Sequence, residues 1–437
     1  MRHYIGSMLH LLRHTLSHVP AYIGALLLLA LADGTGAQAA PEPHGKHFLA
    51  LEEAVVAGPR GSGESAPAAD AIERLQERLE EQRLADGPYA PAAAETLADL
   101  ARLLETRGQL AQALARREEA LHLIRVNEGL YSAAQGPVLR AMLDSLRAAG
   151  DFTALDQRYA YYYRLYGAGR PPFNDLRWAA TMEYLDWQRE ALRRELDADP
   201  RERLLELHAT QADLLLSVAE DPAFDWRWLL DLTRSQLATL YIVEDAVQPE
   251  VQMLRRSRVT RVRGDELRDF DPLQERLDNL QRTARAQGRM LVEAALQRVP
   301  EAEVAARAGL RLDLADWLLW HGSTRSAQEL YGTVWEELEA AGRDDLLDEW
   351  FARPRPLPRG EFFAPLDRPR DSALRVRIDV SASGRVRVSS EGVPEERARE
   401  FSRLRRLLRA SRFRPALRAG EAIDVRDLST SWLLIDD

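Results

Sequence analysis

The sequence predicts a mostly α-helical protein, in which a helical-repeat solenoid is followed by a small α+β domain with the element order ββαβ. Three observations predict this class. Apolar residues recur every three to four positions through most of residues 70–352, glycine-containing turns interrupt that pattern, and a period of two appears only after residue 372. With 437 residues, of which 46% are hydrophobic, the chain can bury a large core in more than one domain.

The N-terminal segment has the features of a secretory signal peptide. Arg2 and Arg13 precede an apolar run at residues 21–32, and residues 37–39 (Ala-Gln-Ala) place small side chains at the spacing that signal peptidase reads. The run has about twelve residues, whereas a helix needs roughly 20 to cross a bilayer. We therefore expect 1–39 to be removed and the mature protein to be periplasmic. An uncleaved segment that anchors the protein in the inner membrane is the alternative.

Residues 40–69 are rich in Ala, Gly, Pro and Ser, which predicts a flexible lead-in to the helices. His44 and His47 in this segment have the spacing of two metal ligands but lack an obvious third ligand. We expect no metal site there. The chain has no cysteine, which excludes disulfides, thiolate metal sites and a lipid-modified cysteine.

Two kinds of position recur within residues 70–352. A glycine marks the turn between two helical segments, and a small residue on the second segment allows the pair to approach closely. Gly108, Gly150 and Gly322 occupy the turn position, and Ala113 and Ala327 occupy the small position. These segments resemble tetratricopeptide repeats (TPRs). The resemblance implies a stack of helix pairs over residues 70–352, in which each pair buries its apolar face against its neighbours.

Two residues depart from the repeat pattern. Leu155 replaces the small residue in the copy at Gly150, and Arg117 stands where an aromatic residue is usual in the copy at Gly108. Between residues 173 and 309 the chain is helical in pattern but shows no clear motif, which indicates either drifted helix pairs or an insertion of another kind. A less favoured alternative is that the protein is a hydrolase, with its active site within residues 173–309.

A tyrosine cluster is the most distinctive feature of the helical region. Tyr159, Tyr162, Tyr163 and Tyr166 share one face of a predicted helix. This face either lines a groove that binds a partner or packs against the next helix pair. Tyr161 lies on the other side, where we expect it to be an exposed contact.

A proline-rich segment, residues 353–371, is predicted to be a stiff linker. At roughly 3.1 Å per residue it could hold the C-terminal domain up to about 55 Å away. The domain after it, residues 372–437, begins with an alternating strand at 374–380, a turn at 381–384 and a second strand containing Val386 and Val388. A helix follows from Pro394. Its predicted apolar stripe is Ala398, Phe401, Leu404 and Leu408.

The later run Arg-Phe-Arg-Pro-Ala at 412–416, with Gly420 and a final strand, completes a pattern that resembles the C-terminal domain of the TonB energy-transducer family. The resemblance implies a small domain that recognises an extended peptide at a sheet edge. We expect the last strand, from Thr430 to Ile435, to be a free edge. The expected partner contacts there are Arg412, Arg414, Thr430, Trp432 and Leu434, with a core position as the alternative for Trp432.

Catalytic chemistry has little support in the sequence. Lys46 is the only lysine, so the folded part has no residue for a lysine-based mechanism. Four acidic residues lack the spacing of a calcium loop and indicate a helix boundary instead: Asp265, Glu266, Asp269 and Asp271. The net charge of −10 disfavours nucleic acid as a partner. We therefore predict a non-catalytic interaction scaffold without a cofactor, which binds a protein or peptide partner in the cell envelope. A TonB-type energy transducer or transport accessory is the alternative if the N-terminal segment stays as an anchor.

Overall fold

A computed structural model describes residues 48–51, 66–194, 196–220, 225–245, 271–357, 374–389 and 395–434. The predicted signal peptide, His44 and His47 lie outside these ranges. The chain divides into two compact units. The N-terminal unit comprises Glu53–Trp187, and the C-terminal unit comprises Gln188–Asp437 together with Met1–Glu52. Within the described ranges, no helix is both long and apolar enough to cross a membrane.

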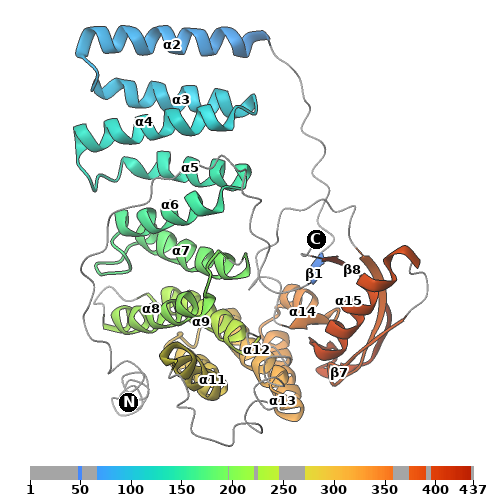
Figure 1. The fold of residues 1–437 in the computed structure, drawn as a ribbon. Helices are drawn as coiled ribbons and strands as arrows, with labels where there is room; N and C mark the ends of the chain where they lie inside the picture. Colours follow the sequence, from blue (N-terminus) through green and yellow to red (C-terminus); the bar gives the residue numbers. More distant parts are fainter. Residues whose placement is uncertain are drawn as a thin grey trace, which may run out of the picture. The chain divides into compact units, whose positions relative to one another are not determined.

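The N-terminal unit is a row of antiparallel helices (Figure 1). Its helices are α2 (Ala66–Asp86), α3 (Pro91–Thr106), α4 (Leu110–Glu128), α5 (Gln135–Ala149), α6 (Phe152–Leu165) and the greater part of α7 (Asp175–Arg193). Pro91 is the first residue of α3, where its missing N–H costs nothing, and the carboxylate of Asp151 accepts a hydrogen bond from the Ala154 N–H at the start of α6. α3, for example, buries Leu97, Leu100, Ala101 and Leu104 along one face.

The helices of the C-terminal unit include much of the region where the sequence showed no motif. They are α8 (Pro200–Glu220), α9 (Trp226–Asp245), α11 (Pro272–Leu296), α12 (Val304–Trp320), α13 (Thr324–Ala340) and α14 (Asp344–Phe351). The helical pattern that the sequence showed between residues 173 and 309 is confirmed by α8, α9 and α11. Asp271 caps α11 by accepting hydrogen bonds from two backbone N–H groups, so its acidic cluster does end at a helix boundary.

The turn glycines are confirmed and have a common geometry. Gly108, Gly150 and Gly322 all have φ between 72° and 78°, in the left-handed region that glycine adopts without strain. In each turn the next residue donates its N–H to the carbonyl five positions earlier, as in a Schellman motif. Gly342 repeats this geometry between α13 and α14, a copy that the sequence pattern did not reveal. Ala113 and Ala327 are fully buried, as the repeat pattern requires.

Arg117, which stands where an aromatic residue is usual, is buried and contacts polar side chains. Its guanidinium lies 2.6 Å from a carboxylate oxygen of Glu105 on α3 and also donates to the Ser145 hydroxyl on α5. The hydrogen bond from Arg117 lowers the pKa of Glu105. An ion pair and a hydrogen bond therefore join three successive helices where an apolar contact is usual.

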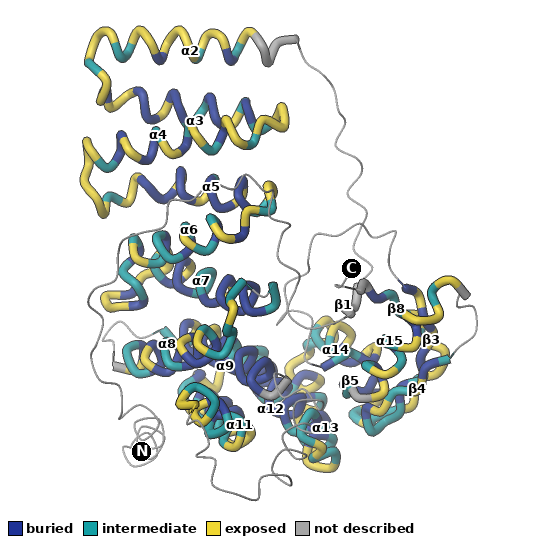
Figure 2. The backbone as a smooth tube through the Cα atoms, in the orientation of Figure 1, coloured by how far each residue is buried: buried dark blue, intermediate teal, exposed yellow. Residues whose placement is uncertain are grey.

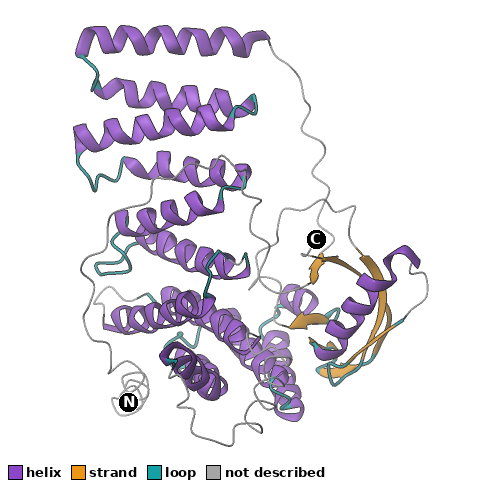
Figure 3. Ribbon diagram, viewed as in Figure 1, coloured by secondary structure: helices purple, strands orange, loops and turns teal. Residues whose placement is uncertain are grey.

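The C-terminal domain contains the predicted ββαβ order with additional short strands (Figure 3). Its elements are β3 (Leu374–Val380), β4 (Val386–Val388), α15 (Ala398–Ala410), β5 (Arg412–Arg414), β6 (Ala416–Arg418), β7 (Glu421–Ile423) and β8 (Val425–Leu434). Its core holds Phe401, Leu404 and Leu408 from the predicted stripe of α15. Ala398 is exposed, because α15 begins at that residue.

Two segments from earlier in the chain add strands to this domain. β1 (Phe48–Leu51) pairs antiparallel with β8, which gives a sheet with the order β1-β8-β3-β4. β2 (Arg355–Leu357), at the start of the proline-rich segment, pairs antiparallel with β5. Residues 355–357, shortly after α14, thus form a two-stranded sheet with a strand of the C-terminal domain.

The C-terminal domain packs against the last helices of the solenoid. Leu357 and Leu417 belong to the same buried cluster as apolar residues of α12 and α13. The amide of Gln328 on α13 donates to the Ala382 carbonyl in the β3–β4 turn, at 2.9 Å. The domain is therefore in contact with the last repeat and is not held away from it.

Candidate partner-binding site

The shared tyrosine face is a packing surface. Tyr159, Tyr162 and Tyr166 are buried, and Tyr159 stacks on Trp187 of α7 with the ring centroids 5.0 Å apart. Burial raises the pKa of the Tyr163 phenol to about 12, and its ring stacks on Tyr184 at 4.2 Å. The hypothesis that Tyr159, Tyr162 and Tyr166 line an open groove is wrong, because α7 covers this face.

Tyr161, on the opposite face of α6, is half-buried and contacts residues that hold the loop between α4 and α5. Its hydroxyl donates to the side-chain oxygen of Gln135 at 2.6 Å, and the guanidinium of Arg125 lies 4.5 Å from its ring centroid. Gln135 in turn donates to the Leu130 carbonyl at 2.8 Å. These contacts fix the loop between α4 and α5, so Tyr161 orders the exposed surface beside it.

The predicted free edge at the last strand is wrong. β8 has β3 on one side and β1 on the other, and Ser431–Leu434 pair with Leu51–Phe48. Trp432 is buried in the domain core, in contact with Phe413. Thr430 is half-buried and accepts a hydrogen bond from the Trp432 indole N–H at 2.9 Å. The side chain of Leu434 lies outside the described residues.

Arg414 is a buried internal contact, contrary to the prediction that it meets a partner. Only 2% of its side chain is exposed, and its guanidinium binds both carboxylate oxygens of Asp316 on α12, at 2.9 and 2.6 Å. The Tyr331 hydroxyl donates to the same carboxylate at 2.8 Å, and burial raises the pKa of Tyr331 well above its usual value. Arg412 is half-buried in β5, where it pairs with Leu357 of β2.

An exposed apolar edge on the N-terminal unit is the strongest candidate for a binding surface, and the sequence reasoning missed it. The described residues include six large apolar side chains that are exposed, and all six lie in or beside the α2–α3, α4–α5 and α6–α7 loops. These loops share one end of the helix row (Figure 2). We call this surface the apolar edge; it consists of Leu84, Tyr89, Val126, Leu130, Tyr131 and Leu176.

Polar contacts hold the apolar edge in place. The Asn127 side-chain amide donates to the Tyr89 carbonyl at 3.0 Å, which joins the α2–α3 loop to the end of α4. Leu84, near the end of α2, is 87% exposed, and Tyr131, in the α4–α5 loop, is 72% exposed. Single exposed apolar residues are common, but a group on one edge of a protein marks an interaction surface. Tyr89, Leu130 and Tyr131 lie in loops, where the helical period gives no signal.

A cleft between α11, α12 and α13 is the second candidate. It has a volume of about 430 Å³ and mixed chemistry. Its lining includes Trp317, which is buried, and the charged residues Arg285, Arg289, Glu293 and Glu329. Arg289 and Glu293 pair with each other at 2.7 Å, so these two charges of the lining partly neutralise one another.

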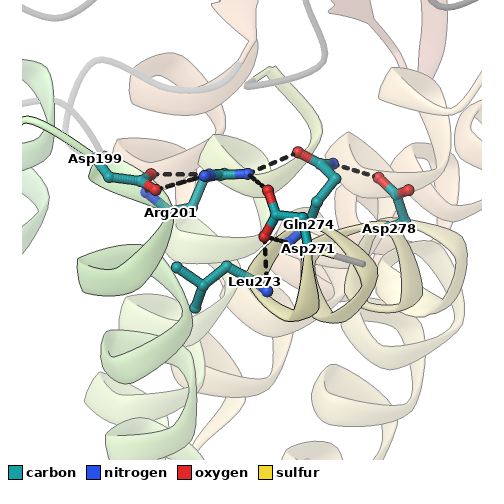
Figure 4. Close-up of polar contacts among 6 residues, drawn as sticks. All are labelled: Asp199, Arg201, Asp271, Leu273, Gln274 and Asp278. Carbon is teal, nitrogen blue, oxygen red and sulfur yellow. Dashed lines mark hydrogen bonds and ion pairs between the residues drawn. The ribbon is translucent and has the colours of Figure 1, made fainter. Parts of the chain in front are cut away.

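A polar network at the helix starts of the C-terminal unit is structural (Figure 4). Arg201 bridges Asp199, 2.5 Å away, and Asp271, 2.7 Å away, and hydrogen bonds from Arg201 lower the pKa of both carboxyls. The network joins the start of α8 to the start of α11. Across the described ranges, no group of three His, Asp or Glu residues could hold a metal ion.

Two partly or fully buried histidines give the C-terminal unit a pH-dependent stability. Burial lowers the pKa of His208, and burial together with the charge of Arg285 lowers that of His321 to about 4. Below pH 6.5 the unfolded chain therefore binds protons that the folded chain does not, so stability is present above about pH 6.5 and falls as the pH drops towards 4.

For His321, which is partly exposed, we expect a loss of about 1–2 kcal/mol over this pH range. The measurement is the free energy of unfolding in urea at about pH 7 and about pH 4.5 for the wild type and His321→Gln. The variant should lose less stability on acidification than the wild type. Equal losses in the two proteins would show that His321 does not contribute.

Comparisons with known proteins found similarity to solved structures but not to family models or curated proteins. No protein-family model and no curated protein matches the chain. Among solved structures, a Podosopora anserina protein described as a kinesin light chain with nearly identical TPR-like repeats is similar to this chain, with 14% identity and a TM-score of 0.33. The match covers 58% of this chain and 98% of the other. The assignment of TPR-like helical repeats rests on the turn and burial geometry of this chain itself.

Proposed function

We propose that the protein is a non-catalytic scaffold that binds another protein through the apolar edge of its N-terminal helical repeats. The observation that carries this proposal is the gathering of the exposed large apolar side chains in or beside three loops at one end of the helix row. Tyr89 and Tyr131 are rigid amphipathic side chains of the kind that anchor protein interfaces. The loops are held by hydrogen bonds, so binding would require little additional ordering.

We further propose that the scaffold works in the cell envelope after export. The support is the sequence of residues 1–39, with a short apolar run followed by Ala-Gln-Ala. The order of strands and helix in residues 374–434 is compatible with the TonB-like domain that the sequence suggested. Because Arg414 and the turn at 381–384 contact the last repeat, we assign this domain first to closing the end of the solenoid.

The test is the loss of partner binding when the apolar edge is made polar. We expect the triple variant Tyr89→Ser, Leu130→Ser, Tyr131→Ser to keep its helical circular dichroism but to capture its envelope partner at least tenfold more weakly, because the apolar anchors contribute most of the binding energy. The matched control is Thr106→Ser, Arg107→Ser, Gln109→Ser, at exposed positions of the α3–α4 turn. Equal capture by the two variants would refute the apolar edge as the binding surface.

A further inference from the structure

One face of the C-terminal domain carries a row of arginines. Residues 374–389 and 395–434 contain 14 Arg against 7 Asp and Glu, a net charge of +7, in a chain whose net charge is −10. α15, the 13-residue helix that lies across the sheet, carries five of these arginines and a single acidic residue (Figure 1). Four of the five recur at spacings of three or four residues, which places them on one side of the helix. We call this row the arginine stripe; it consists of Arg399, Arg403, Arg406 and Arg409.

The arginine stripe faces away from the core of its domain. The apolar side of α15 is buried against the sheet. Arg399, Arg406 and Arg409 are exposed, and none of the three has an acidic partner among the described residues. Glu400, the acidic residue of α15, pairs with Arg397, which precedes the helix. Most of the positive charge of the stripe is therefore not neutralised by the described part of the domain.

The other face of the sheet is also basic, but its charges are partly balanced. Arg375, Arg377 and Arg387 are exposed there, because alternate residues of a strand point to opposite faces of a sheet. Arg377 lies 3.5 Å from the Asp427 carboxylate, and Arg387 lies opposite Asp379 on the neighbouring strand. This face therefore offers three arginines with two carboxylates beside them, which makes it a matched control for the arginine stripe.

We propose that the arginine stripe docks the C-terminal domain on a bilayer of anionic lipids. A guanidinium binds a phosphate group through two parallel hydrogen bonds. A helix of 13 residues is about 20 Å long, so its arginines can meet several headgroups at once. Each arginine near an anionic bilayer strengthens binding roughly fivefold. Because the apolar side of α15 belongs to the domain core, the helix cannot insert that side between lipids, and we expect attraction by charge alone.

Two observations favour a lipid surface over other anionic partners. A protein interface needs apolar or aromatic anchors, and all six exposed large apolar side chains of the described residues lie in the N-terminal unit. A lipid surface needs no such anchors, only several phosphates within reach of a row of arginines. Nucleic acid is disfavoured by the proposed location in the cell envelope, and to this extent the inference rests on the proposed function.

The first test measures how tightly the full chain binds vesicles, by co-sedimentation at about 0.1 M salt. The anionic vesicles contain equal parts of phosphatidylglycerol and phosphatidylcholine. The variant Arg399→Gln, Arg406→Gln, Arg409→Gln should bind them at least tenfold more weakly than the wild type, because three charges of the stripe are gone. Vesicles of phosphatidylcholine alone measure any binding through the apolar run at residues 21–32, which every variant retains.

The matched control is Arg375→Gln, Arg377→Gln, Arg387→Gln, which removes the same number of charges from the other face of the sheet. It should bind the anionic vesicles within about threefold of the wild type, and both variants should keep the helical circular dichroism. Equal affinities of the two variants would overturn the proposal, because binding would then follow net charge and not the stripe. A difference between the wild type and the stripe variant that persists at about 0.5 M salt would also overturn it, since salt screens attraction by charge.

A competition experiment separates lipid from other polyanions. Double-stranded DNA and poly-glutamate are each added to the wild type on anionic vesicles, at the same concentration of negative charge as the lipid. We expect most of the protein to stay on the vesicles. Displacement of most of it by DNA or by poly-glutamate would assign the stripe to nucleic acid or to an acidic protein and overturn the proposal. These outcomes do not depend on Tyr89 and Tyr131, so failure here is separable from failure of the apolar edge.

Discussion

Replacing Arg414 with Met is expected to lower the free energy of unfolding of the C-terminal unit by about 3–5 kcal/mol. The guanidinium and the Asp316 carboxylate are 2% and 1% exposed, and they meet through two hydrogen bonds. Met keeps much of the side-chain volume but leaves the carboxylate buried without its cationic partner. The Tyr331 hydroxyl would still donate to that carboxylate but carries no positive charge to offset it. Urea unfolding followed by tryptophan fluorescence measures the change, since Trp317 and Trp350 lie in the same unit.

The control for this prediction removes both charges. Asp316→Leu together with Arg414→Met replaces a buried ion pair by apolar side chains, an exchange that is often neutral or stabilising. We expect the double variant to recover most of the stability that the single variant loses. If the single variant is as stable as the wild type, the pair does not fix the C-terminal domain to α12 as the structure indicates.

Replacing Gly384 with Ala is expected to cost about 2–4 kcal/mol, the second largest effect. Gly384 has φ of +73°, which strains any other residue. A Cβ atom there would also collide with the Phe413 carbonyl oxygen and lie 3.1 Å from Leu319 of α12. The Gly384 carbonyl accepts a hydrogen bond from the Phe413 N–H at 2.9 Å, so the turn cannot move without breaking that bond. The free energy of unfolding in urea is again the measurement.

Gly342→Ala separates the two causes. Gly342 has φ of +65°, but nothing lies within 4 Å of the position that a Cβ would occupy. The control should therefore lose only the cost of the left-handed backbone, roughly 1–2 kcal/mol. Equal losses at Gly342 and Gly384 would mean that the β3–β4 turn is not pressed against β5 and α12.

The sequence predicted the helical repeats because their signal is periodic and local. Gly108, Gly150 and Gly322 each close a turn through bonds to residues at most five positions away, so their role is visible in a short window of sequence. Gly384 was likewise predicted as a turn residue. Its contact with Phe413 and Leu319 is not local, and the pattern around it carries no sign of that contact.

The binding residues were harder to predict because exposure depends on what covers a side chain. The tyrosines of α6 were expected to contact a partner, but α7 covers them. Arg414 was expected to do the same, but it binds Asp316, which lies 98 positions away in the sequence. The last strand, β8, was expected to have a free edge, but β1 pairs with it. β1 comes more than 300 residues earlier, in a segment whose composition predicted only a flexible lead-in. Residues of the apolar edge, such as Leu130 and Tyr131, lie in loops that have no period.

Site-specific photo-crosslinking tests the central claim most directly, because it reports which surface touches the partner in the intact protein. A photoreactive phenylalanine analogue replaces Tyr131 on the apolar edge in one protein and Arg107, exposed at the α3–α4 turn, in another. If the apolar edge binds the partner, irradiation in cells should give a discrete higher-mass adduct from position 131 and none from position 107. Adducts from position 107 alone, or the same adducts from both positions, would contradict binding through the apolar edge.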